Sequence, residues 1–129
     1  MAYANLNRVN QTVDGFDSII IVKDVADVPC GVALDVTDVT DATIKGGTVL
    51  IQKEADSSVK PLGITGEAYE SLPSGYAYYG ILKGTVLTAS PMGAVLKMGV
   101  VNAAAAAKAV GAPYTDAIKT ALKNIEFIY

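Results

Sequence analysis

Histidine and tryptophan are absent from this sequence, and cysteine occurs only once. Without histidine, the chain cannot build His-based catalytic triads, histidine-ligated metal sites or imidazole pH switches. The single cysteine, Cys30, can form neither an internal disulfide nor a thiolate cage, and we interpret it as a small, partly buried side chain. A catalyst would have to rely on carboxylates, lysine, tyrosine or hydroxyl groups. We therefore expect a protein that is not an enzyme and uses no cofactor or metal.

Positive charge and long apolar runs are also scarce. Lys and Arg number 10 against 13 Asp and Glu, which gives a formal net charge of −3. The cations do not cluster, so we expect no nucleic-acid partner. The apolar run at 18–22 has the length of a strand, whereas a helix that crosses a bilayer needs about 20 apolar residues. The first residues lack the apolar core of a signal peptide, and we expect no membrane partner.

The length and composition are those of one folded domain. The chain has 129 residues, of which 51% are hydrophobic and 18% charged. A domain of this size buries a core without help from disulfides or metals. Residues 1–18 are polar and predict either an extended N-terminal arm or a loosely ordered terminus, and both interpretations stay open. Residues 19–129 are expected to form a single β-rich body.

Most of this body has the patterns of β-strands. Residues 19–22 are apolar and mainly β-branched, which predicts a buried strand. Residues 31–36 alternate as a half-buried strand does. A turn centred on Gly46 and Gly47 comes before another strand. Further strands are expected at 76–82, 85–88, 92–97 and 125–129.

Two short helices are predicted in the C-terminal third. Asn102 is a favourable N-cap for a helix over 103–110, and Gly111 ends that helix. Thr115 can cap a second helix over 116–123. Strands and helices do not alternate as they do in βαβ folds. The sequence thus predicts a mainly β fold with two short C-terminal helices, arranged as a compact barrel-like or sandwich domain.

Carboxylates recur at two places along the chain. Asp35, Asp38 and Asp41 are three residues apart, which does not match a calcium loop. We favour a solvated strand edge over a metal site for them, because charge on an edge also prevents aggregation. Glu67 and Glu70 could act as an acid–base pair, which leaves a small carboxylate-dependent enzyme as the least favoured alternative.

Tyrosine and alanine supply the candidate subunit interface. On a strand, Tyr76 and Tyr78 share one face and Tyr79 points to the other. Because tryptophan is absent, we favour a core edge or a subunit interface for these rings over a sugar-binding platform. The alanine-rich helix permits close approach of another backbone, although a plain internal helix is an equally open interpretation. The candidate interface residues are Tyr76, Tyr78, Ala104 and Ala107.

Several short motifs follow one another in the second half of the chain. They are Tyr79-Gly80-Ile81-Leu82 as a core strand, the stretch 97–102 with a small surface turn that leads to a helix, the short helix within 114–123, and the final strand at 125–128. Their order resembles that of the lambda head-decoration protein family of bacteriophage capsid decoration proteins. The segment 41–50 also resembles the opening strand of phage head fibre proteins. Together the resemblance covers roughly residues 35–129.

The resemblance implies a β-tulip fold, often trimeric, on the outside of an icosahedral shell. Such a protein clamps neighbouring subunits of the major capsid protein and stabilises the shell by mass action, because it binds only the assembled state. We therefore expect a structural virion protein on the capsid exterior, made in the host cytoplasm. Its expected partners are the major capsid protein and further copies of itself in a homotrimer. Another virion module, such as a tail, baseplate or host-attachment component, stays open as an alternative.

The N-terminal arm is the candidate contact with the shell. Extended segments commonly bind by adding a strand to an exposed sheet edge, and the Asn and Gln side chains of residues 2–13 can add hydrogen bonds. The candidate capsid-binding residues are Tyr3, Asn5, Leu6, Asn7, Arg8 and Val9.

Overall fold

The computed structural model describes residues 17–129. The candidate capsid-binding residues from Tyr3 to Val9 lie outside this part, as does the side chain of Cys30. In chain order the elements are α1 (Asp17–Ile20), β1 (Ile21–Ala33), β2 (Thr43–Ile44), β3 (Val49–Lys53), β4 (Val59–Pro61), β5 (Ile64–Thr65), β6 (Ala68–Tyr69), β7 (Tyr76–Leu82), β8 (Val86–Leu87), β9 (Met92–Asn102), α2 (Ala103–Val110), α3 (Asp116–Ala121) and β10 (Ile125–Ile128).

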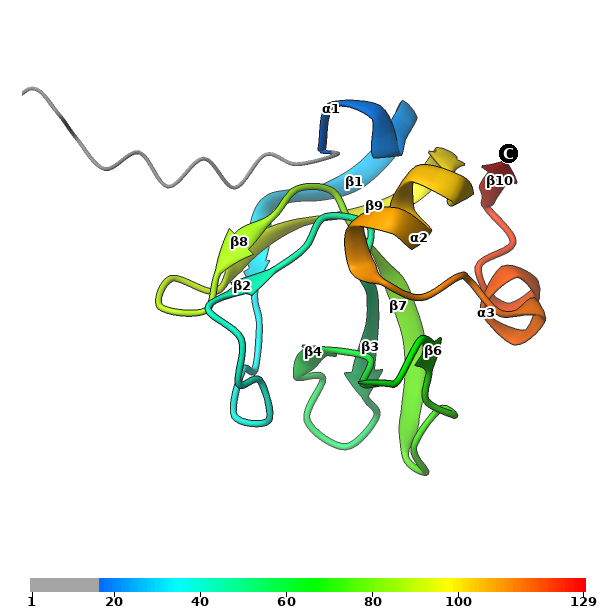
Figure 1. Ribbon diagram of the computed structural model, residues 1–129. Helices are drawn as coiled ribbons and strands as arrows, with labels where there is room; N and C mark the ends of the chain where they lie inside the picture. Colours follow the sequence, from blue (N-terminus) through cyan, green and yellow to red (C-terminus); the bar gives the residue numbers. More distant parts are fainter. Residues whose placement is uncertain (1–16) are drawn as a thin grey trace, which may run out of the picture.

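A six-stranded sheet organises the domain (Figure 1). Its strand order is β1-β9-β7-β3-β4, and β10 runs parallel to the end of β9. The other pairings between named strands are antiparallel, and two small sheets, β2–β8 and β5–β6, complete the described part. The predicted mainly β class with two C-terminal helices is confirmed. Within residues 17–129 the sheets do not close into a barrel, and they fit a sandwich-like domain.

The central strands are buried on both faces. Along β3, Val49 and Ile51 enter a larger core that also receives residues of α2 and α3, whereas Leu50 enters a second, smaller core. In β7, Ile81 and Leu82 divide between the two cores in the same way. Continuous apolar runs in these strands therefore follow from a sheet that is covered on both sides.

The prediction of a buried strand over 19–22 is wrong. Residues up to Ile20 form the single helical turn α1, and β1 begins at Ile21. Ile20 is buried, but Ile19 and Val22 are 49% and 52% exposed. Within residues 17–129, β1 forms an edge of the main sheet and has β9 as its single strand partner, which leaves Val22 more open to solvent than a residue of a central strand. The helix also takes two residues, Asp17 and Ser18, from the predicted arm.

The predicted helix over 103–110 is confirmed together with both of its ends. The Asn102 side chain accepts a hydrogen bond from the Ala105 N–H at 3.0 Å, as an N-cap does. Gly111 ends α2 in the left-handed conformation with a φ of 88°, and its N–H donates to the Ala107 carbonyl. Local capping chemistry therefore fixes this helix.

The second helix is confirmed but shorter than predicted. Thr115 caps α3 by accepting a hydrogen bond from the Ile118 N–H at 3.3 Å. The helix ends at Ala121, because Leu122 leaves the helical conformation and buries its side chain in the larger core.

The expected surface turn within 97–102 is wrong, because these residues lie inside the eleven-residue strand β9. A side chain at Gly99 would collide with the carbonyl oxygen of Lys23 on β1. Glycine here permits two strand backbones to approach closely rather than turning the chain.

Candidate functional site

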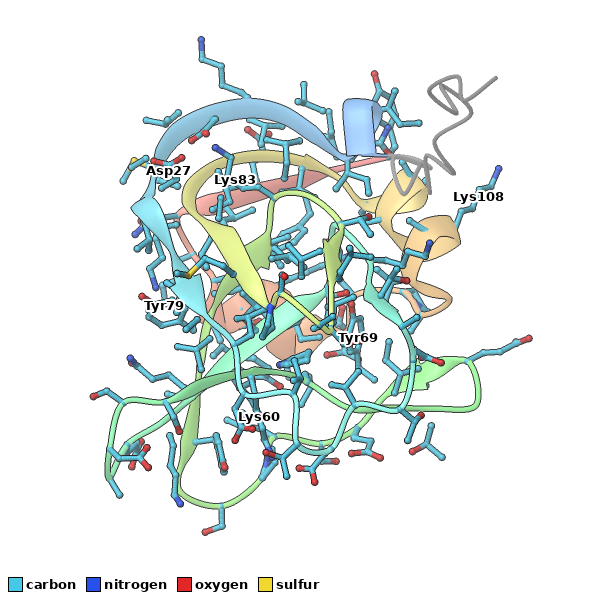
Figure 2. All side chains as sticks on the ribbon, turned by 90° about the vertical axis from the view of Figure 1, so that its left-hand side faces the viewer. Asp27, Lys60, Tyr69, Tyr79, Lys83 and Lys108 are labelled. Atoms are coloured by element: carbon cyan, nitrogen blue, oxygen red, sulfur yellow. The ribbon has the colours of Figure 1, made fainter. Side chains whose placement is uncertain are left out.

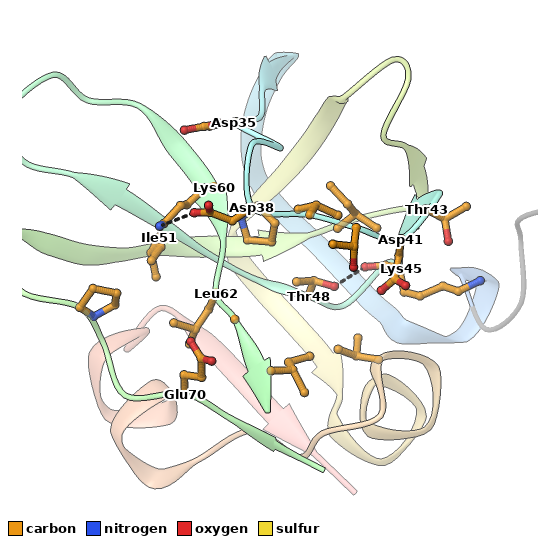
Figure 3. Close-up of a pocket in the computed structure, with 18 residues that line it drawn as sticks. Asp35, Asp38, Asp41, Thr43, Lys45, Thr48, Ile51, Lys60, Leu62 and Glu70 are labelled. Carbon is orange, nitrogen blue, oxygen red and sulfur yellow. Dashed lines mark hydrogen bonds and ion pairs between the residues drawn. The ribbon is translucent and has the colours of Figure 1, made fainter. Parts of the chain in front are cut away.

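A polar cleft of about 480 Å³ lies between the segment 35–48 and strands β3 to β5 (Figure 3). Its lining includes the apolar side chains of Ile44, Ile51 and Leu62, each of which is buried. Charged side chains of both signs complete the lining: Asp35, Asp38, Asp41, Lys45, Lys60 and Glu70. The cleft has the size of a small-ligand site.

Several of these charged groups already have partners. Lys60 pairs with Asp38 at 3.5 Å, which is long for a hydrogen bond and exposed to solvent. Glu70 accepts a hydrogen bond from the Thr65 hydroxyl at 2.6 Å. Hydrogen bonds from the side chain and backbone of Thr37 lower the pKa of Asp35. Asp35 is thus a carboxylate at neutral pH, able to accept hydrogen bonds but not to act as a general acid.

The cleft gathers the three predicted aspartates but not the predicted glutamate pair. Asp35, Asp38 and Asp41 are exposed, and Glu70 lines the same cleft. Glu67 does not line it. In the described part of the chain, no three His, Cys, Asp or Glu side chains come close enough together to hold a metal ion.

The four candidate interface residues differ in exposure and lie on two elements, β7 and α2. Tyr76 and Tyr78 are half-buried and pack on the larger core, whereas Tyr79 packs on the smaller one, so the predicted alternation of faces is confirmed. Ala104 is exposed on α2 and Ala107 is half-buried. The first residues of β7 lie at the end of the domain away from α2 (Figure 1).

A second surface is apolar and lies around α1, α2 and the last residue. Ile19, Ala104, Ala105 and Tyr129 line a shallow, open hollow together with Asn102 and Lys108. Sequence reasoning missed this surface, because it assigned residues 19–22 to the core. The signal that could have revealed it is the charge directly after them, since Lys23, Asp24 and Asp27 are typical of an edge strand.

An ion cluster fastens the edge strand beside this surface (Figure 2). Lys83, directly after β7, contacts the carboxylates of Asp24 and Asp27 on β1, the latter at 2.7 Å. These bonds, first to Asp24 and then to Asp27, raise the pKa of the Lys83 amine, while the bond from Lys83 lowers the pKa of Asp27. Lys83 therefore reaches across β9 and ties the edge strand to the centre of the sheet.

Comparison with known proteins gives no relative. No protein-family model matches this chain, and no curated protein or solved structure matches it. Within residues 17–129, every helix is too short or too polar to cross a membrane.

Proposed function

We propose that this protein is a structural virion component that binds the outside of an assembled phage capsid. It stabilises the shell by bridging subunits of the major capsid protein, and a homotrimer is part of this proposal. The observation that carries it is the order of elements in the C-terminal half. The Gly80-Ile81-Leu82 segment of β7 is followed by the two-residue strand β8, then by β9, two short helices and β10. Apart from the surface turn that β9 replaces, this is the order of motifs on which the resemblance to capsid decoration proteins rests.

The mechanism is thermodynamic rather than catalytic. A protein that binds the assembled shell and not its free subunits lowers the free energy of the shell at every occupied site. At a free concentration of 100 times Kd, each site contributes about 2.7 kcal/mol. Bridging two capsid subunits adds avidity, because the second contact forms at a high effective concentration. Many modest contacts then sum to a large resistance to internal pressure.

The direct test is to add the purified protein to shells that lack it. Co-sedimentation measures binding, and the temperature at which the shells break measures stabilisation. We expect saturable binding and a higher breaking temperature. Deletion of residues 2–13 should abolish binding while circular dichroism shows an unchanged domain. Shells that bind the deleted protein as tightly as the full chain would contradict the role of the arm, and shells that bind neither would contradict the function.

A further inference from the structure

The hollow beside α1 and α2 is open and mainly apolar. It has a volume of about 380 Å³, and a single set of side chains surrounds it: Ile19, Asn102, Ala104, Ala105, Lys108 and Tyr129. Two of these side chains, Ile19 and Tyr129, are large and apolar, and they are 49% and 88% exposed in the described part of the chain. Exposed apolar side chains that share one hollow mark a contact surface more often than scattered ones do.

The segment that precedes α1 joins the domain at the edge of this hollow. The described part of the chain begins at Asp17, two residues before Ile19. A chain extends by at most about 3.5 Å per residue, so Phe16 and Val13 can lie no farther than about 11 Å and about 21 Å from Ile19. Because the segment is tethered, its contact with the hollow forms at a high effective concentration. No other part of the chain outside residues 17–129 is attached so close to the hollow.

The chemistry of residues 10–16 matches that of the hollow. Val13 and Phe16 are the large apolar residues of this segment, and Asp14 is its one charged residue. Lys108 is the one charged side chain that lines the hollow, and it takes part in no ion pair among the described residues. The segment therefore offers apolar groups to an apolar surface and a carboxylate to an amine without a carboxylate partner in the described part of the chain.

The other charged side chains of β1 and β10 lie outside the hollow. Asp24 and Asp27 contact Lys83, whereas Lys23 and Glu126 are exposed and opposite in sign. These groups border the surface without lining it, so they do not decide which charge fits inside the hollow.

We propose that residues 10–16 lie over this hollow in the free protein, with Val13 and Phe16 on its apolar side chains and Asp14 beside Lys108. The inference does not depend on the proposed function, because it concerns the protein without shells. It leaves the candidate capsid-binding residues, Tyr3 to Val9, outside the contact. The covering segment then fixes the direction in which the rest of the arm leaves the domain.

The test measures how fast a maleimide reagent modifies a cysteine placed in the hollow. Ala104→Cys supplies the thiol at an exposed position of the lining, in a Cys30→Ser background that leaves no other cysteine. We expect Val13→Asp to speed the modification at least fivefold, because it removes the apolar contact. Thr12→Asp is the matched control, since threonine has the shape of valine and receives the same charge. It should change the rate less than twofold.

Two further probes complete the design. Ile19→Cys provides a second position in the hollow and should respond to Val13→Asp in the same way. Ala55→Cys lies on the exposed loop between β3 and β4, at the end of the domain away from α2 (Figure 1). Its rate should be the same with every arm variant. Circular dichroism checks that each variant is folded.

Each outcome supports or overturns the inference. Equal rates at both hollow positions with the unchanged arm and with Val13→Asp would overturn it. It would also be wrong if Thr12→Asp speeds the reaction as much as Val13→Asp, since charge rather than apolar contact would then control access. A rate that falls as the protein concentration rises would show that a second copy covers the hollow instead of the same chain. Shells take no part in these measurements, so a negative result leaves the proposed function standing.

Discussion

The hydroxyl group of Tyr114 joins two distant parts of the larger core. It donates a 2.6 Å hydrogen bond to the carbonyl oxygen of Gly47, which lies 67 residues earlier in the chain. The ring is only 7% exposed, stacks on Tyr69 at 6.2 Å and meets Phe127 edge-on at 5.0 Å. The Tyr114→Phe variant removes the hydroxyl group and keeps the ring contacts, so it isolates the hydrogen bond.

The expected cost follows from the buried carbonyl group that would remain. Gly47 is buried, so its carbonyl oxygen cannot easily exchange Tyr114 for water. A buried polar group without a partner costs about 1–3 kcal/mol. We therefore expect Tyr114→Phe to lower the free energy of unfolding by about 2 kcal/mol. For a domain of this size, that corresponds to a decrease in Tm of about 8 °C.

Urea unfolding followed by circular dichroism measures this change, and Tyr129→Phe is the matched control. Tyr129 is 88% exposed, so removing its hydroxyl group should change the stability by less than about 0.5 kcal/mol. Equal unfolding midpoints for Tyr114→Phe and the control would refute the reasoning. Such a result would mean that the bond to Gly47 does not hold the β2–β3 turn against the C-terminal segment.

Three further predictions concern the sheet, a helix cap and pH. Gly80→Ala would place a methyl carbon 2.7 Å from the Leu96 carbonyl oxygen, so we expect a loss of about 2 kcal/mol in urea titrations. Gly63→Ala would collide only with the end of the exposed Glu70 side chain and should be nearly neutral. Asn102→Ala should cost about 1 kcal/mol in the same assay, and Asn102→Asp should retain most of the stability. The hydrogen bond from Lys83 lowers the pKa of Asp27 below its usual value of 3.8. The stability that this ion pair adds to the folded protein is therefore present above about pH 4 and is lost as the pH falls below that value. In the Lys83→Met variant, Tm should therefore decrease less between pH 7 and pH 2 than in the unchanged protein. An equal decrease in both proteins would count against the ion cluster.

The dependence of Tm on pH above pH 9 tests whether the buried Tyr114 resists ionisation. Burial raises the pKa of the Tyr114 phenol, so the folded protein keeps this group neutral where an unfolded chain ionises it. Stability is then fully present below about pH 10 and decreases as the pH rises above that value. In Tyr114→Phe, Tm should fall less steeply between pH 9 and 11 than in the unchanged protein. Identical slopes would show that this tyrosine does not resist ionisation.

Local signals account for the parts of the fold that could be predicted from sequence. Asn102 and Gly111 mark the ends of α2, and both act through hydrogen bonds to residues within one turn of the helix. The position of β7 was also predicted, because the strand is apolar and is followed by a break. These features depend on residues that are close together in the sequence, so the sequence alone predicts them.

The errors arose where burial depends on partners far along the chain. Whether Val22 is buried depends on which strands flank β1, and among the described residues its one strand partner, β9, begins about 70 residues later. The fit between Gly99 and the Lys23 carbonyl group has the same origin. The cleft was missed because its walls come from segments near 35–48, 60–64 and 70–73, which no local pattern connects.

The most direct test of the proposed function is the amount of this protein in purified particles of the phage that the proposal implies, measured against the major capsid protein. A decoration protein that covers the shell should be present at a molar ratio close to that of the major capsid protein. A much smaller ratio would place it at vertices or in the tail and would favour the alternative virion module. Its absence from the particles would contradict the proposed function.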